Sequence, residues 1–236
     1  MVNPSSEIFP RLILWDIDGT LIRIKRLNSA SPHKNALRNH GYSFHESRIE
    51  FSGLTDYEVF LEIIKRNGRK IDRKSLLSAF NDLDEESHKL DKVSTFDLYQ
   101  GVQEMLEGLA SIGWTHGILT GNTKFRLNSK LKNAGIASYF KHDLLFGCEF
   151  GDSRESIASN AREFLRHKKY SLVLVLGDTP QDITTARSVN FPVISVATGS
   201  FSVDQLSIYK PDILLRDLTI DAEILFKFLN HLVSSR

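Results

Sequence analysis

The sequence predicts an α/β protein whose core is a doubly wound, Rossmann-like parallel sheet, interrupted near its N-terminal end by a helical insertion. Three observations predict this fold. Short apolar runs alternate with amphipathic helical patterns from residue 101 onward. One more apolar run, Arg11–Trp15, stands apart near the start of the chain, and a stretch with helical periodicity separates it from the rest. Alternation of strand and helix favours a parallel sheet with helices on both faces.

The first expected strand is Arg11–Trp15, which is rich in Leu and Ile and stops at Asp16. Beyond about residue 25 the chain changes character. Asp56–Arg66 and Ser75–Leu90 have helical periodicity, and β-branched runs are few there. The expected domains are a catalytic core of residues 1–24 and 95–236 and a helical insertion of residues 25–94.

The second part of the chain repeats one rhythm, in which each apolar strand is followed by an amphipathic helix. The expected strands are Thr115–Leu119, Leu144–Phe146, Leu172–Leu176, Val193–Ala197 and Ile213–Leu215. The expected helices are Val102–Ile112, Lys124–Ala134, Ser156–His167, Asp182–Val189 and Ala222–Val233. The insertion therefore splits one core domain into a short first part and a long second part.

The composition excludes several classes of protein. Hydrophobic residues make up 41% of the 236 residues, which is typical of a globular protein. The 30 basic residues nearly balance the 29 acidic ones, so no overall field would hold nucleic acid or an anionic membrane. No apolar run approaches the roughly 20 residues that a membrane helix needs. Cys148 is the only cysteine and the first ten residues lack a secretion-signal pattern, so we expect a cytoplasmic protein.

Two carboxylates follow the first strand directly. Asp16 and Asp18 stand two residues apart, with Gly19 and Thr20 after them. In extended geometry both side chains would lie on one side of the chain. Two like charges so close are unfavourable without a cation or a shared proton, which indicates a metal ligand or a nucleophile paired with an acid. The alternative is a structural turn in which Gly19 supplies only its backbone freedom.

Two further segments place polar groups after apolar strands. Asp178 follows the run Leu172–Leu176 and Gly177, and Asp182 stands one helical turn later, so the pair could ligate magnesium or only stabilise a helix start. Thr120, Gly121 and Asn122 follow the strand Thr115–Leu119, where a hydroxyl and free N–H groups could cradle phosphate or cap a helix. Ligands of open α/β sheets bind at this edge, so the three segments together predict one site.

These segments resemble a known family. The sequences DIDGT at residues 16–20, ILTGN at 118–122 and GDTPQD at 177–182 resemble motifs one, two and four of the haloacid dehalogenase superfamily, in order and in spacing. The resemblance covers nearly the whole chain. Asp18 gives the first motif the DxD form of the family's phosphatases, and the helical insertion is similar to the cap of the phosphoglycolate phosphatase and β-phosphoglucomutase group.

The resemblance implies a mechanism. Asp16 would attack phosphorus and form an aspartyl phosphate, and Asp18 would pass protons. Mg²⁺ would be held by Asp16, the Asp18 carbonyl and Asp178, with Asp182 orienting a metal-bound water. The resemblance also implies that Thr120, Gly121 and Asn122 would bind the oxygens of the transferring phosphoryl group.

One departure from the family concerns its third motif, which usually supplies a lysine, often as Lys-Pro. No Lys-Pro occurs in the corresponding stretch Phe150–Glu155, where Arg154 is the cation best placed to substitute. Arginine binds carboxylate and phosphate through a planar fork and is not equivalent to lysine. Either a catalytic Arg154 or a surface Arg154 fits the sequence.

The predicted substrate is a small phosphorylated metabolite, with no nucleic-acid or membrane partner and either a monomeric or a dimeric state. Thr55, Asp56 and Arg48 of the insertion could contact that substrate, although Thr55 and Asp56 could equally cap or pack a helix. The predicted activity is that of a magnesium-dependent phosphatase. A phosphomutase of the β-phosphoglucomutase type, or a non-catalytic phosphate-binding or partner-binding protein on the same fold, remains an alternative.

Overall fold

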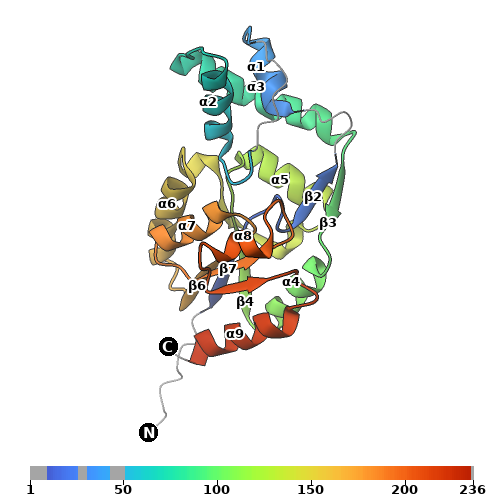
Figure 1. The fold of residues 1–236 in the computed structure, drawn as a ribbon, viewed down its shortest axis with the longest axis vertical. Coiled ribbons are helices and arrows are strands. Elements are labelled where there is room, and N and C mark those ends of the chain that lie inside the picture. Colours follow the sequence, from blue (N-terminus) through green and yellow to red (C-terminus); the bar gives the residue numbers. More distant parts are fainter. Residues whose placement is uncertain (1–9, 26–30, 43–50, 235–236) are drawn as a thin grey trace.

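The computed structural model of the chain describes residues 10–25, 31–42 and 51–234 (Figure 1). Its central feature is a six-stranded parallel sheet with the strand order β5-β4-β1-β6-β7-β8. The strands are β1 Arg11–Trp15, β4 Trp114–Leu119, β5 Phe140–Phe146, β6 Leu172–Gly177, β7 Val193–Val196 and β8 Ile213–Leu215. The doubly wound parallel sheet that the sequence predicts is therefore confirmed.

Helices cover both faces of the sheet, because successive strand residues point to opposite sides. From β1, Ile13 and Trp15 enter one apolar cluster, while Leu12 and Leu14 enter the other. The helices of the first face are α4 Val102–Ser111, α5 Lys124–Asn133 and α9 Ala222–Ser234. Those of the second face are α6 Arg154–Arg166, α7 Pro180–Ser188 and α8 Val203–Ser207.

The position of β1 in the sheet determines where the polar residues of the predicted site lie. It lies at the centre of the sheet and pairs in parallel with β4 on one side and with β6 on the other. The residues that follow these three strands, Asp16, Thr120 and Asp178, therefore come out at one edge of the sheet. This edge is the place where open α/β sheets bind ligands.

Three further helices form a group at the end of the molecule opposite α9 (Figure 1). They are α1 Pro32–Asn39, α2 Asp56–Arg66 and α3 Arg73–Asp91. They have an apolar cluster of their own, with Phe60, Ile63 and Leu83 fully buried. Two antiparallel strands, β2 Ile22–Lys25 and β3 Thr95–Leu98, connect this group to the core. The predicted limits of the insertion fall in these strands, and its status as a separate domain stays a prediction.

The helices predicted from the sequence are present in the structure, and the differences in where they begin have local causes. Helix α2 has the predicted ends, and its N-cap Thr55 forms a capping box with Glu58. Helices α6 and α7 begin two residues earlier than predicted. Their true caps are Ser153 and Thr179, each of which forms a capping box with the residue that the prediction took as the helix start. In the part of the chain that the structure describes, no helix is long and apolar enough to cross a membrane.

Candidate active site

The loop after β1 brings the ends of β1 and β6 into contact. The Asp16 backbone N–H donates to the Leu176 carbonyl oxygen at 2.9 Å. Gly19 has a φ of +93°, and a Cβ atom placed there would lie 2.3 Å from the Asp178 Oδ2 atom. A side chain at this position would be strained and would collide with Asp178. Glycine therefore permits the close approach of the two acidic loops.

Three of the predicted site residues form an acid cluster, which we define as Asp16, Asp178 and Asp182. All three are buried, with exposed fractions of 6%, 2% and 0%. One oxygen atom of each lies within 4.8 Å of an oxygen of the other two. The sequence thus correctly places these carboxylates together at one edge of the sheet.

The acid cluster carries more negative charge than its surroundings neutralise. Burial, followed by the charge of Asp182, raises the pKa of Asp16 from 3.8 to about 7, although Arg154 opposes the shift. Burial and the charges of Asp16 and Asp182 raise the pKa of Asp178 to about 9. A divalent cation would remove both penalties, and carboxylate oxygens are the ligands that Mg²⁺ prefers. The cluster therefore fits a metal ion.

Arg154 lies against this cluster and not on the surface. It is the first residue of α6 and directly follows the N-cap Ser153, and its exposed fraction is 3%. Its Nη1 atom donates to Asp16 Oδ1 at 3.0 Å, and its Nη2 atom donates to Asp182. Burial disfavours its charge, but the charges of Asp182 and Asp16 outweigh burial and raise its pKa. Of the two sequence alternatives, the buried position beside Asp16 is the one found.

Asp182 has both carboxylate oxygens engaged within the protein. Its Oδ2 atom accepts hydrogen bonds from the Thr179 backbone N–H at 3.0 Å and from Thr179 Oγ1 at 2.7 Å. Its Oδ1 atom accepts from Arg154. Asp178, in contrast, accepts a side-chain hydrogen bond only from Thr20 Oγ1, at 2.9 Å, among the described residues. Asp16 and Asp178 are thus better placed as direct ligands, and Asp182 as a supporting group.

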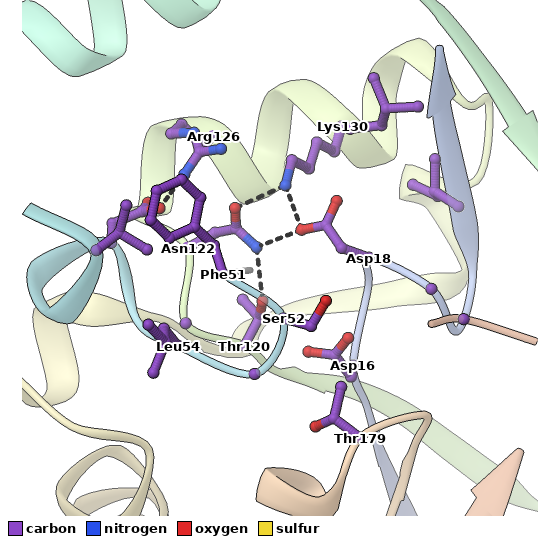
Figure 2. A pocket seen from close by; sticks show the side chains of 18 of the residues that line it. Asp16, Asp18, Phe51, Ser52, Leu54, Thr120, Asn122, Arg126, Lys130 and Thr179 are labelled. Atoms are coloured by element: carbon purple, nitrogen blue, oxygen red, sulfur yellow. Dashed lines mark hydrogen bonds and ion pairs between the residues drawn. The ribbon is translucent and has the colours of Figure 1, made fainter. Parts of the chain in front are cut away.

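A second group of polar side chains lies above Asp16 in Figure 2. We define the lysine triad as Lys130, Asp18 and Asn122. Lys130 Nζ donates to Asp18 Oδ2 and, at 2.6 Å, to Asn122 Oδ1. Asn122 Nδ2 donates to Asp18 Oδ2 at 3.0 Å and to Thr120 Oγ1 at 2.7 Å. The Asp18 side chain is 46% exposed to the cavity, but the protein around it displaces bulk water and so opposes its charge. The charge and the hydrogen bond of Lys130 outweigh this and lower the pKa of the Asp18 carboxyl group.

Lys130 and its helix neighbour Arg126 do not appear among the residues predicted from the sequence. Both are buried, with exposed fractions of 3% and 5%. The available signal is their spacing, because they stand four residues apart and each directly precedes a leucine of the buried stripe Leu127 and Leu131. Residues at this spacing share one face of a helix. Cations next to an apolar stripe were therefore candidates for an inward position.

Gly121, in the predicted phosphate cradle, is also the contact point with the insertion. The Asp56 backbone N–H donates to its carbonyl oxygen at 2.7 Å. A Cβ atom at Gly121 would lie 2.6 Å from the Leu54 carbonyl oxygen. The preceding Thr120 is buried and donates its backbone N–H to the Phe146 carbonyl oxygen at 3.0 Å. The cradle and the start of α2 are therefore packed directly together.

Thr55 and Asp56, which the sequence analysis names as possible substrate contacts, form hydrogen bonds within the protein. Thr55 is fully buried as the N-cap of α2, and its hydroxyl donates to the Asp152 carbonyl oxygen at 2.8 Å. Asp56 accepts from Arg126, from the Thr123 backbone N–H at 2.8 Å, and lies 2.8 Å from His33 Nε2. These contacts favour the capping and packing alternative for Thr55 and Asp56. The third predicted contact, Arg48, lies outside the described residues.

The acid cluster and the lysine triad open into one cavity of about 1350 Å³ between the sheet edge and the helical insertion. The core contributes charged side chains to its wall, namely Asp16, Asp18, Arg23, Arg126, Lys130, Arg154, Asp178 and Asp182. The insertion contributes Lys34, Arg38 and Asp56, together with apolar Phe51 and Leu54. Concave sites of this kind bind small ligands, and the charged side chains in the wall favour a charged one.

Comparisons with known proteins agree with this geometry. The profile of the haloacid dehalogenase-like hydrolases matches residues 13–196. The pyrophosphatase PpaX of Bacillus velezensis is 28% identical over 211 residues, which cover 88% of this chain and 92% of the relative. The phosphoglycolate phosphatase of Vibrio parahaemolyticus is 24% identical over 226 residues, covering 89% and 93%.

Among solved structures, CbbY from Rhodobacter sphaeroides in complex with phosphate superposes with a TM-score of 0.68. The match covers 88% of this chain and 94% of that one at 15% sequence identity, so it supports the fold. The family profile begins within β1 and ends with β7, so it includes the helical insertion and five of the six strands of the parallel sheet. The prediction of an enzyme related to the phosphatases of this family is confirmed, and the chain belongs to the haloacid dehalogenase-like hydrolases.

Proposed function

We propose that the chain is a magnesium-dependent phosphatase that hydrolyses a small phosphorylated metabolite through an aspartyl phosphate on Asp16. The observation that carries this proposal is the position of Asp16. Its carboxylate is buried at the sheet edge, within 4.8 Å of two other carboxylates and 3.0 Å from the Arg154 guanidinium. A nucleophile held beside a cation and a metal-binding set of oxygens is the arrangement that phosphoryl transfer needs.

In the first step an oxygen of Asp16 attacks phosphorus, and the bond to the leaving oxygen breaks. The leaving oxygen keeps the bonding electron pair and takes a proton from Asp18, which acts as general acid. In the second step water attacks the phosphorus of the aspartyl phosphate and gives its proton to Asp18. The Asp16 carboxylate is then released, so the two steps together consume one water and free one phosphate.

The other site residues would hold charge and geometry. Arg154 takes the place of the lysine of the family's third motif, stabilising the carboxylate of Asp16 and the charge on the phosphoryl oxygens. Thr120, Gly121 and Asn122 would bind the transferring phosphoryl group. Mg²⁺, held by Asp16, Asp178 and the Asp18 carbonyl oxygen, would offset the repulsion between the anionic nucleophile and the anionic substrate.

The helical insertion would act as a cap over the site. Its start at Leu54 and Asp56 packs on Gly121, and it supplies one wall of the cavity. A cap of this kind excludes bulk water and selects the leaving group. The names of the relatives, a pyrophosphatase and a phosphoglycolate phosphatase, support a small phosphorylated substrate.

The direct test is phosphate release from a panel of small phosphoesters and phosphoanhydrides, with and without magnesium. We expect the native chain to release phosphate only with magnesium. Asp16→Asn should reduce the rate by at least about 1000-fold, because the amide is a poor nucleophile. Asp143→Asn, which changes an exposed aspartate on β5, is the matched control and should keep full activity.

Two results would contradict the proposal. Release that persists in Asp16→Asn would exclude Asp16 as the nucleophile. Conversion of a sugar phosphate into its isomer, without free phosphate, would replace the phosphatase by a phosphomutase.

A further inference from the structure

Lys130 is a buried lysine whose charged group lies beside the proposed proton-transfer residue. Lysines on helices usually carry the ammonium group into water, but the Lys130 side chain is only 4% exposed. A buried ammonium is costly unless its donors are used. Here two of its three donors are used, on Asp18 and Asn122, which follow the neighbouring strands β1 and β4. Helix α5 thus places one cation at the junction of two catalytic loops.

The contacts of the lysine triad fix how the Asp18 carboxylate is turned. Lys130 and Asn122 both donate to the same oxygen, Oδ2. No described residue donates to the other oxygen, Oδ1, and the Asp18 side chain is 46% exposed at the cavity wall. Figure 2 shows the three side chains joined in a closed ring. The ring holds one oxygen inside the protein and leaves the other for a reacting group.

We propose that Lys130 is a positioning residue that orients Asp18 for proton transfer, a role that rests on the phosphatase function proposed above. Lys130 acts through Asp18 and Asn122 and does not bind the substrate. The cation that serves the phosphoryl group is Arg154, which contacts Asp16. Asn122 completes the arrangement because it bridges Lys130 to Asp18 on one side and to Thr120 on the other.

Steady-state kinetics of Lys130→Met test this role, with the best ester from the panel and saturating magnesium. Methionine keeps the length of the side chain without its donors. We expect kcat to fall by about 10- to 100-fold, as for impaired acid–base catalysis, and KM to stay within about twofold. Lys132→Met, two residues further on the exposed face of α5, is the matched control and should leave both constants unchanged. Lys130→Arg should recover part of the lost kcat.

A double-mutant cycle with Asp18→Asn separates positioning from a structural role. If Lys130 acts through Asp18, adding Lys130→Met to Asp18→Asn should lower kcat by no more than about twofold further. Multiplying losses would overturn the proposal, because they would mean that Lys130 acts independently of Asp18. A tenfold rise of KM in Lys130→Met would also overturn it, in favour of substrate binding.

Two controls keep the outcomes distinct. If thermal unfolding shows that Lys130→Met does not fold, the same cycle is run with Lys130→Arg, and the same criteria apply. A native chain that releases no phosphate from any ester would overturn the phosphatase function itself and this role with it. An active native chain with multiplying losses would overturn only the role of Lys130.

Discussion

The two sides of the active site treat their carboxylates in opposite ways. In the acid cluster, burial and mutual repulsion raise the pKa of Asp16 to about 7 and that of Asp178 to about 9. On the side of α5, Lys130 and Arg126 overcome burial and lower the pKa values of Asp18 and Asp56. One side is short of positive charge, and the other is neutralised by the protein itself. The acid cluster thus has uncompensated negative charge that a cation could neutralise, whereas the cations of α5 already neutralise the carboxylates beside them.

Removing a cation from the neutralised side should have the largest effect on stability. Arg126→Met leaves the buried Asp56 carboxylate without its ion pair. We expect the free energy of unfolding to fall by about 3 kcal/mol, because an unpaired buried charge is expensive. Urea unfolding measures this change. Arg166→Met, which breaks an exposed pair with Glu163, is the control and should cost less than about 1 kcal/mol. An equal loss in the two variants would contradict the comparison.

Removing a carboxylate from the acid cluster should raise the free energy of unfolding instead of lowering it. Asp178→Asn takes away a buried carboxylate whose ionisation is unfavourable in the fold. Without a metal ion and at about pH 8, we expect this variant to be more stable than the native chain by at least about 2 kcal/mol. Urea unfolding in the presence of a chelator measures the difference, with Asp143→Asn as the neutral control. A destabilised Asp178→Asn would mean that the cluster is already neutralised.

The metal-free chain should lose stability as the pH rises. A carboxyl group whose pKa is raised on folding stabilises the fold below its ordinary value of 3.8, and this contribution is lost as the pH passes toward the folded value. Asp16 and Asp178 should therefore each lower the free energy of unfolding by about 1.4 kcal/mol per pH unit up to about pH 7. Above that only Asp178 contributes, up to about pH 9. A flat profile for the native chain between pH 5 and about 9 would contradict the raised pKa values.

The acid cluster was predictable from the sequence, and the reason is geometric. The runs Arg11–Trp15 and Leu172–Leu176 are apolar enough to be buried strands, and acids follow each of them directly. Parallel neighbours in a doubly wound sheet bring such residues to one edge. Arg154 was also identified, because the family resemblance narrowed the search to the stretch Phe150–Glu155.

The neutralised side was not predictable in the same way. Helix α5 carries four cations, and their spacing relative to the apolar stripe is only a weak signal of which of them face inward. Only the packing of Leu127 and Leu131 turns Arg126 and Lys130 toward the site, while Lys124 and Lys132 remain exposed. Strands β2 and β3 were also missed. They are short, and their pairing depends on contacts between segments some 70 residues apart, which local patterns do not encode.

The most direct test of the account is the effect of magnesium on thermal unfolding at about pH 8, for the native chain and for Asp178→Asn. The account predicts that millimolar magnesium raises the midpoint of the native chain by about 5 °C, because the ion binds the folded acid cluster and relieves its repulsion. Asp178→Asn should shift by less than about 1 °C, and Asp143→Asn should shift like the native chain. Equal shifts in the native chain and Asp178→Asn, or no shift in either, would contradict a metal site at the acid cluster.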